Sequence, residues 1–165
     1  MRFLKSLRLQ EFLYNTGIKL YKWLIRIAAF QNTKARHFIQ GRKTVFEQLV
    51  NDVVLNENYV WFHCSSLGEF EQGRPLIEKI RSSMPHVRIV LTFFSPSGYE
   101  MRKDYEHVDE VYYLPLDTPG NAYRFVKILQ PKLAIFVKYD FWYNYLKNLA
   151  AFRIPTLLIS AGFRQ

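Results

Sequence analysis

Serines, a glycine and a carboxylate gather in residues 63–69 (HCSSLGE), directly after an apolar run. Ser65, Ser66 and Gly68 come just before or at the start of a predicted helix, where free backbone N–H groups and hydroxyls can bind an anion such as a phosphate. Glu69 falls in the first turn of that helix, where the helix dipole stabilises an ionised carboxylate. Such a carboxylate can accept a proton from a substrate hydroxyl. The spacing is equally that of a capping box between Ser66 and Glu69, so both interpretations stay open.

Two further segments of similar chemistry follow later apolar runs. Ser95, Ser97 and Gly98 could bind a phosphate or sugar hydroxyls, or could form an ordinary helix cap and tight turn. Lys138 and Asp140 stand beside aromatic residues, and together these could form a platform for a sugar or a phosphate. The alternative is that the aromatic side chains belong to the core while the lysine and the aspartate form a solvated pair.

The elements that must position these residues alternate along the chain. Short apolar runs rich in β-branched and aromatic residues predict strands, and the stretches between them predict helices. This alternation predicts a parallel sheet covered by helices on both faces, that is, a doubly wound, Rossmann-like α/β domain. The predicted strands are 59–64, 88–93, 110–114, 133–137 and 156–160, and the predicted helices between them are 68–83, 97–105, 119–129 and 141–151.

All three candidate segments follow the end of a predicted strand. In an open sheet of this kind, ligands bind beyond the carboxyl ends of the strands, so we expect the candidate residues to lie on one edge. No G-x-G-x-x-G follows the first strand, which argues against a dinucleotide cofactor.

Composition and charge narrow the functional classes. Cys64 is the only cysteine, which excludes an internal disulfide and a cysteine-based zinc site, and we predict no metal site. Residues 1–43 contain ten Lys or Arg and one acid, whereas the remainder contains thirteen of each sign. A basic segment beside apolar residues suits an anionic membrane surface, whereas nucleic-acid binding would spread the charge over the folded body. We therefore predict a membrane-associating arm, residues 1–43, and a Rossmann-like domain, residues 44–165.

Residues 12–30 combine this charge with an apolar stripe. Lys19, Lys22 and Arg26 share one side of a helix, and Trp23 belongs to the apolar residues of the other side. Because the cations interrupt the apolar run, we expect an amphipathic helix lying in a membrane interface rather than a signal peptide or a membrane span. The alternative is a helix that packs its apolar side on its own domain.

Five motifs follow one another along the chain, and in number and order they resemble the N-terminal half of the Kdo (3-deoxy-D-manno-octulosonic acid) transferases. They are W-x-H-x-x-S-x-G-E (61–69), T-x-x-S-x-S-G (92–98), Y-L-P-L-D (113–117), Q-P-K-L (130–133) and I-P-T-L-L-I-S-A (154–161). Residues 138–144 read KYDFWYN where many members read E-T-E-x-W-P-N, so that a lysine and an aspartate replace two acids.

The resemblance implies an inverting, metal-independent glycosyltransferase of the two-domain GT-B fold, without a cofactor. It implies CMP-Kdo as the donor, lipid IVA (a lipid A precursor) as the acceptor, no nucleic-acid partner, and a place at the cytoplasmic face of the inner membrane. The acceptor would bind to the N-terminal domain, with Ser65, Ser66, Gly68, Ser95, Ser97, Gly98, Lys138 and Asp140 as candidate contacts. Glu69 would be the general base. The C-terminal donor domain of the family is absent from these 165 residues, so we expect the chain alone to be inactive.

Two other interpretations remain. The first is a noncatalytic membrane-surface module that binds an anionic lipid or a phosphate. The second is an unrelated two-domain sugar-nucleotide enzyme that shares only the architecture.

Overall fold

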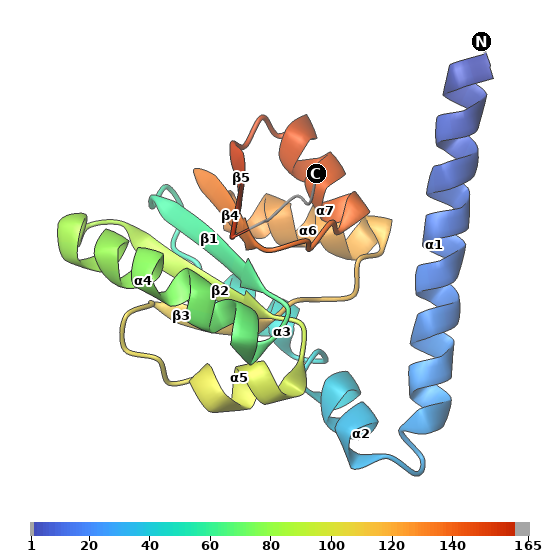
Figure 1. Ribbon diagram of the computed structural model, residues 1–165, viewed down its shortest axis with the longest axis horizontal. Coiled ribbons are helices and arrows are strands. Elements are labelled where there is room, and N and C mark those ends of the chain that lie inside the picture. Colours follow the sequence, from blue (N-terminus) through green and yellow to red (C-terminus); the bar gives the residue numbers. More distant parts are fainter. Residues whose placement is uncertain (1, 161–165) are drawn as a thin grey trace.

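The backbone forms a five-stranded sheet with helices on both faces and a long N-terminal helix beside it (Figure 1). A computed structural model of the chain describes residues 2–160, with side chains from residue 8 onward. All strand pairings are parallel, in the spatial order β3-β2-β1-β4-β5, which confirms the predicted Rossmann-like α/β fold. The strands are β1 (Tyr59–Cys64), β2 (Arg88–Phe93), β3 (Glu110–Tyr113), β4 (Leu133–Val137) and β5 (Thr156–Ile159).

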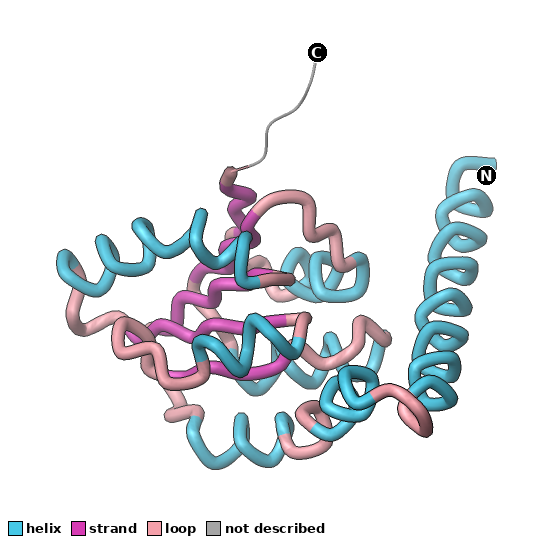
Figure 2. The backbone as a smooth tube through the Cα atoms, turned by 60° about the horizontal axis from the view of Figure 1, so that its bottom comes forward, coloured by secondary structure: helices cyan, strands magenta, loops and turns pink. Residues whose placement is uncertain are grey.

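Helices cover the sheet in two layers (Figure 2). On one face lie α4 (Leu67–Ser83) and α5 (Pro96–Arg102), and on the other lie α3 (Val45–Asp52), α6 (Pro119–Leu129) and α7 (Tyr143–Ala151). The predicted elements between residues 59 and 160 all form, with shifts only at their ends. The last residues of the predicted domain, 161–165, lie outside the described part of the chain.

Each face of the sheet has its own apolar core, because successive side chains of a strand point to opposite faces. Trp61 is fully buried on one face, with its ring centre 4.9 Å from that of Phe125. Phe62, the next residue, is fully buried on the other face in the cluster that contains Phe70 of α4. Burial on both faces explains why the strands read as continuous apolar runs in the sequence.

Helix α4 runs unbroken through Gly73 and Pro75, two residues that could have disturbed its first turns. Gly73 is buried, and a Cβ atom there would lie 2.9 Å from Val137 Cγ2, so the glycine allows α4 to approach β4 closely. The start of α4, which carries Glu69, is thereby fixed against the end of the central strands.

The N-terminal arm consists of α1 (Arg2–Ala28) and α2 (Thr33–Gln40). Polar contacts hold α1 beside the domain. The Tyr14 hydroxyl donates to Asp117 Oδ2 over 2.7 Å, and Asn144 Nδ2 donates to Asn15 Oδ1 over 2.9 Å. Asn15 and Tyr14 therefore face the domain.

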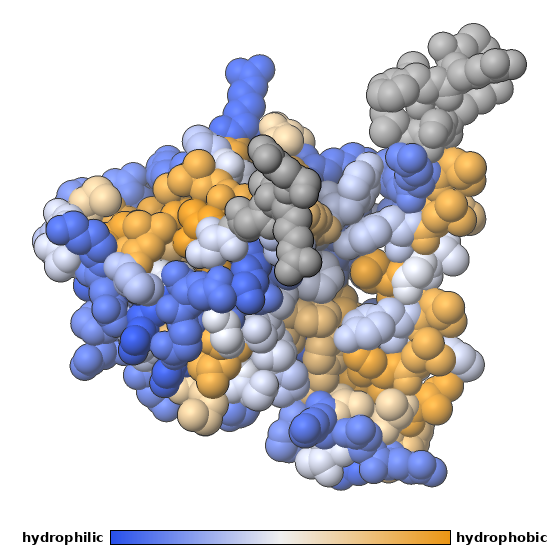
Figure 3. All heavy atoms as spheres, viewed as in Figure 1, coloured by the Kyte–Doolittle hydropathy of each residue, from blue (hydrophilic) through white to orange (hydrophobic). Residues whose placement is uncertain are grey.

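The opposite side of α1 is an exposed apolar stripe, visible as the orange column along this helix in Figure 3. Its members are between 48% and 65% exposed: Leu9, Phe12, Leu13, Leu20, Trp23, Leu24 and Ile27. Within the described residues, this stripe does not pack on the α/β domain. Within residues 2–160, no helix is both long and apolar enough to cross a membrane.

Candidate active site at the carboxyl edge of the sheet

The candidate residues meet at the point where the chain changes direction across the sheet. Strands β1 and β4 are neighbours, but β1 leads into α4 on one face and β4 leads into α7 on the other. The crevice at such a switch point is where open α/β sheets bind their ligands. The turns after β1, β2 and β4, which carry the three predicted segments, lie along this edge.

Hydrogen bonds join the three turns directly. Asp140 Oδ2 accepts from the hydroxyl of Ser65 over 2.6 Å and from its backbone N–H over 3.1 Å. The backbone N–H of Ser95 donates to the carbonyl oxygen of Ser65 over 2.8 Å. The structure thus brings together residues that lie up to 75 positions apart in the sequence.

Glu69 is half-buried in the first turn of α4, and its Oε2 accepts from the backbone N–H of Ser66 over 3.0 Å. The predicted capping box of Ser66 and Glu69 is present. The other carboxylate oxygen, Oε1, makes no hydrogen bond within the described residues. Gly68 beside it is exposed, and a Cβ atom there would meet nothing within 4 Å. One face of the carboxylate is therefore fixed while the other is open to a ligand.

A second carboxylate lies close to Glu69. Burial raises the pKa of Asp140, and the negative charge of Glu69 raises it further, whereas the hydrogen bonds from Ser65 lower it. Two carboxylates at one edge of a crevice, one of them with a raised pKa, are typical of a site that handles protons.

His63, at the end of β1, is fully buried, and its Nε2 lies 3.5 Å from Asp140 Oδ2. Burial, with the charge of Arg42 as a smaller contribution, lowers the pKa of His63 to about 3. The indole N–H of Trp142 donates to His63 Nε2 over 3.0 Å, so that nitrogen carries no proton. His63 Nδ1 is therefore the protonated nitrogen, and it donates to Thr92 Oγ1 over 2.8 Å.

The histidine orients an aromatic wall of the crevice. Trp142 is half-buried and its ring centre lies 4.5 Å from that of Phe94, the residue after β2. The sequence placed Trp142 beside candidate polar residues but gave no reason to include Phe94, because a phenylalanine at a strand end is an ordinary core residue. Aromatic faces of this kind can stack on the apolar side of a sugar ring or on an acyl chain.

Arg42 has a structural role at this edge that the sequence alone did not indicate. Its guanidinium donates to the carbonyl oxygens of Leu114, Phe38 and Phe94, and it lies 3.6 Å from the centre of the Phe38 ring. Burial lowers the pKa of Arg42 to about 10, so the side chain remains charged at neutral pH. Arg42 thereby ties the arm to the ends of β2 and β3.

The remaining predicted contacts take different places. Ser97 is exposed, and Ser95 Oγ caps α5 by accepting from the backbone N–H of Gly98 over 3.1 Å. Gly98 is buried, and a Cβ atom there would lie 2.5 Å from the Phe93 ring. Gly98 is thus a packing residue beneath the turn, and its N–H is already used. Lys138 is half-buried in a left-handed backbone conformation (φ 65°) that turns the chain after β4.

Asp117 caps α7, although it lies just before α6 in the chain. Its carboxylate accepts from the backbone N–H groups of Asn144 and Tyr145, in the first turn of α7. The following helix, α6, is capped by Thr118 instead, whose hydroxyl accepts from the backbone N–H of Asn121. Within residues 2–160, no three His, Cys, Asp or Glu side chains converge where they could hold a metal ion.

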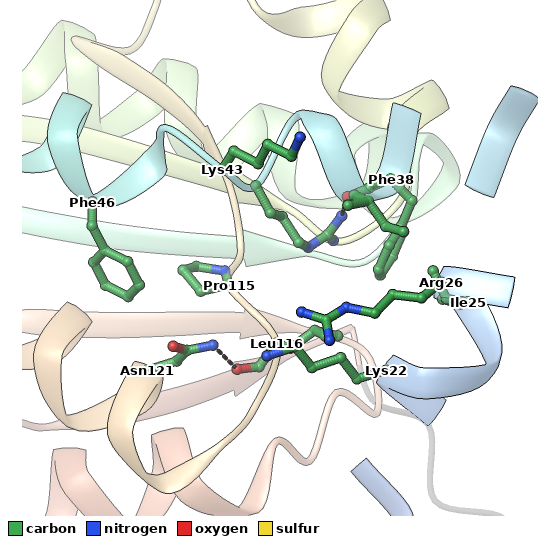
Figure 4. Close-up of a pocket in the computed structure, with 11 residues that line it drawn as sticks. Lys22, Ile25, Arg26, Phe38, Lys43, Phe46, Pro115, Leu116 and Asn121 are labelled. Carbon is green, nitrogen blue, oxygen red and sulfur yellow. Dashed lines mark hydrogen bonds between the residues drawn. The ribbon is translucent and has the colours of Figure 1, made fainter. Parts of the chain in front are cut away.

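The four residues of α1 that were predicted to lie at a membrane interface fall into two groups in the structure. Lys19 and Trp23 are exposed to solvent. Lys22 and Arg26 line a cavity between α1 and the domain, on the side of Pro115 (Figure 4). The cationic side of the helix therefore turns partly toward the protein, not wholly toward the surroundings.

The sequence of the chain is similar to those of known glycosyltransferases. The sequence profile described as 3-deoxy-D-manno-octulosonic-acid transferase (kdotransferase) matches residues 23–165. The 3-deoxy-D-manno-octulosonic acid transferase of Haemophilus influenzae is 36% identical over 104 residues, which is 62% of this chain and 24% of that protein. The enzyme of the same name from Aquifex aeolicus is 33% identical over 104 residues, 62% of this chain and 28% of that protein.

A bifunctional glycosyltransferase/methyltransferase of Fusobacterium nucleatum is 29% identical over 140 residues, covering 83% of this chain and 21% of that protein. This chain spans about a quarter of the length of the relatives it matches. The family profile, in contrast, covers most of the chain, including all five strands and the candidate site. The chain belongs to the 3-deoxy-D-manno-octulosonic acid (Kdo) transferase family, as an N-terminal domain of such a glycosyltransferase.

Proposed function

We propose that the full-length protein transfers Kdo from CMP-Kdo to the lipid A precursor lipid IVA, and that the domain described above holds the acceptor. Family membership supports the transfer of Kdo. The observation that carries the acceptor assignment is the position of Glu69, a carboxylate at the switch point of the sheet with one oxygen capping α4 and the other free. The free oxygen is available to accept a proton from an acceptor hydroxyl.

In the proposed reaction, a hydroxyl oxygen of the acceptor attacks the anomeric carbon of Kdo. The bond between that carbon and the phosphate oxygen of CMP breaks, and its electron pair leaves with CMP. The acceptor proton passes to the free oxygen of Glu69 as the new glycosidic bond forms. Holding the acceptor close to this carboxylate converts a slow encounter into an intramolecular step.

The acceptor contacts follow from which polar groups remain available. The Ser65 hydroxyl already donates to Asp140, so Ser65 positions the turn more than it binds. The side chains of Ser97 and Lys138 have no acidic or carbonyl partner within residues 8–160, which leaves them free for hydroxyl or phosphate groups of a lipid. Trp142 and Phe94 would form the apolar wall beside them.

A transfer assay tests this proposal. The full-length protein is supplied with CMP-Kdo and lipid IVA, and mass spectrometry measures the mass that an added Kdo residue gives to the lipid. Omission of either substrate is the control. Product that depends on both substrates is the expected result, and a complete, folded protein that forms no product would remove the proposal.

We propose further that α1 rests on the cytoplasmic surface of the inner membrane through its exposed apolar stripe. The support is the 57% exposure of Trp23 together with the basic charge of the arm. Anionic vesicles should shift Trp23 emission to shorter wavelength, because the indole leaves water. The shift is read as the difference between the wild type and Trp23→Phe, since Trp61 is buried in the core and the half-buried Trp142 is present in both proteins. An unchanged spectrum on vesicle addition would contradict the membrane contact.

A further inference from the structure

A cavity of about 330 Å³ lies between the arm and the carboxyl edge of the sheet (Figure 4). Lys22 and Arg26 of α1 line it from one side, and the α2–α3 turn contributes Arg42 and Lys43. The loop between β3 and α6 closes it with Pro115. In Figure 4, the side chain of Arg26 extends from α1 toward the centre of this cavity. The cavity is separate from the turns that carry Glu69 and Asp140.

The lining of the cavity is strongly cationic. Four of its eleven lining residues are Lys or Arg, and none is acidic. Within residues 8–160, none of the four belongs to an ion pair. Arg42 is satisfied by carbonyl oxygens alone, which orient its charge without neutralising it. Four uncompensated cations around one concave space raise the local concentration of anions.

The donors and the apolar parts of the lining favour a phosphate with a hydrophobic attachment. Lysine and arginine side chains bind phosphate oxygens through charge-assisted hydrogen bonds. Ile25, Phe38 and Leu116 also line the cavity and give part of it an apolar surface. A phosphate that carries an organic group would use both kinds of surface.

The position of the cavity on α1 points to the source of that phosphate. Lys22 and Arg26 are the cavity residues of α1, and the adjoining side of the same helix exposes Trp23, Leu24 and Ile27. A molecule whose phosphate lies in the cavity would have an exposed apolar stripe next to it. We infer that this cavity binds the phosphate group of an anionic lipid. The inference rests on the proposed membrane contact of α1 and names the chemical group that the contact recognises.

Vesicle binding by charge-matched variants tests the inference. The cavity variant is Lys22→Gln with Arg26→Gln, and the control variant is Arg8→Gln with Lys19→Gln. Both remove two positive charges from exposed positions of α1, but only the first pair lines the cavity. Binding of the full chain to phosphatidylcholine vesicles with and without phosphatidic acid is measured by co-sedimentation, and circular dichroism verifies the helix content of each variant.

The cavity variant should lose at least about tenfold more affinity for phosphatidic acid vesicles than the control variant does. A diffuse electrostatic attraction contributes about fivefold per cation near the surface and affects both variants alike. Equal losses in the two variants would therefore overturn the inference and leave only general attraction between the arm and the membrane.

Inorganic phosphate serves as a second probe, because it distinguishes a lipid from a free ion. At matched ionic strength, phosphate should release the wild-type chain from phosphatidic acid vesicles only partly, since it lacks the apolar part of the ligand. Binding of inorganic phosphate to the chain with no preference for phosphatidic acid over phosphatidylcholine would assign the cavity to a free anion and overturn the lipid assignment. The Trp23 emission shift and the transfer assay are read separately, so a failed cavity test leaves those proposals distinguishable.

Discussion

Asp140 Oδ2 accepts hydrogen bonds from both the hydroxyl and the backbone N–H of Ser65, over 2.6 and 3.1 Å. This pair closes the switch point, because it ties the turn after β1 to the turn after β4. Ser65 and Asp140 were both candidate ligand contacts, but in the structure they hydrogen-bond to each other. These bonds fix the positions of the two turns beside Glu69.

Replacing Asp140 or Ser65 should lower the free energy of unfolding, and the two losses should not be additive. Asp140→Ala leaves the Ser65 N–H without its acceptor, and we expect a loss of about 1–3 kcal/mol in the free energy of unfolding. Ser65→Ala should cost about 1 kcal/mol. A double-mutant cycle by urea denaturation should give a coupling of about 1 kcal/mol, whereas strictly additive losses would contradict a direct bond between these side chains.

The neutral state of His63 predicts a defined pH dependence. Its pKa is lowered to about 3 in the folded protein, against about 6.5 in the unfolded chain. The unfolded chain therefore binds the additional proton first, and the stability that His63 contributes is complete above pH 6.5 and declines as the pH falls toward 3. The slope is about 1.4 kcal/mol per pH unit at most.

His63→Gln isolates this contribution, because glutamine can donate to Thr92 and accept from Trp142 but does not titrate. Unfolding free energies of both proteins are measured by urea denaturation between pH 4 and 8, a range that includes the unperturbed histidine pKa. The variant should lose less stability than the wild type on acidification. Parallel pH profiles for the two proteins would show that His63 titrates normally.

The guanidinium of Arg42 should not be replaceable by an ammonium group. Arg42→Lys removes the planar group between the Phe38 and Phe94 rings and cannot reach all three carbonyl oxygens at once. We expect a loss of about 2–4 kcal/mol in the free energy of unfolding, since buried carbonyl groups lose their donors. Arg36→Lys, at an exposed position of α2, is the control and should be near neutral. A wild-type midpoint for Arg42→Lys would contradict this role.

Two glycines of the candidate site should respond oppositely to the same substitution. A Cβ atom at Gly98 would lie 2.5 Å from the Phe93 ring, so Gly98→Ala should lose about 1–3 kcal/mol through overpacking. Gly68 has open space around it in the first turn of α4, so Gly68→Ala should be neutral or stabilising by up to about 1 kcal/mol. Thermal unfolding of both variants measures the difference, and equal effects would refute the packing account of Gly98.

The fold could be predicted from the sequence because its signals are local. β1, β2 and β4 are buried on both faces, so they read as apolar runs bounded by polar turns, and their predicted limits are confirmed. α7 begins at Tyr143 instead of residue 141, because the chain first makes a tight turn in which the Phe141 N–H donates to the Tyr139 carbonyl. Such a turn depends on the left-handed Lys138, which composition does not reveal.

The residue types of the candidate site could be predicted from the sequence, but the contacts between these residues could not. Helical spacing showed that Lys22 and Arg26 share a side of α1, but it could not show which side faces the domain. That is decided by Tyr14 and Asn15, whose partners lie more than a hundred residues away. The roles of Arg42 and Phe94 likewise arise only when the arm and the ends of β2 and β3 come together.

The most direct test of the account is the transfer rate of Glu69→Gln in the full-length enzyme. Glutamine retains the oxygen that accepts from the Ser66 N–H, so the cap and the fold should survive, whereas the base is lost. We expect wild-type unfolding behaviour together with a kcat for Kdo transfer lower by about 100- to 10,000-fold. A correctly folded Glu69→Gln enzyme that transfers Kdo at the wild-type rate would contradict the assignment of Glu69 as the general base.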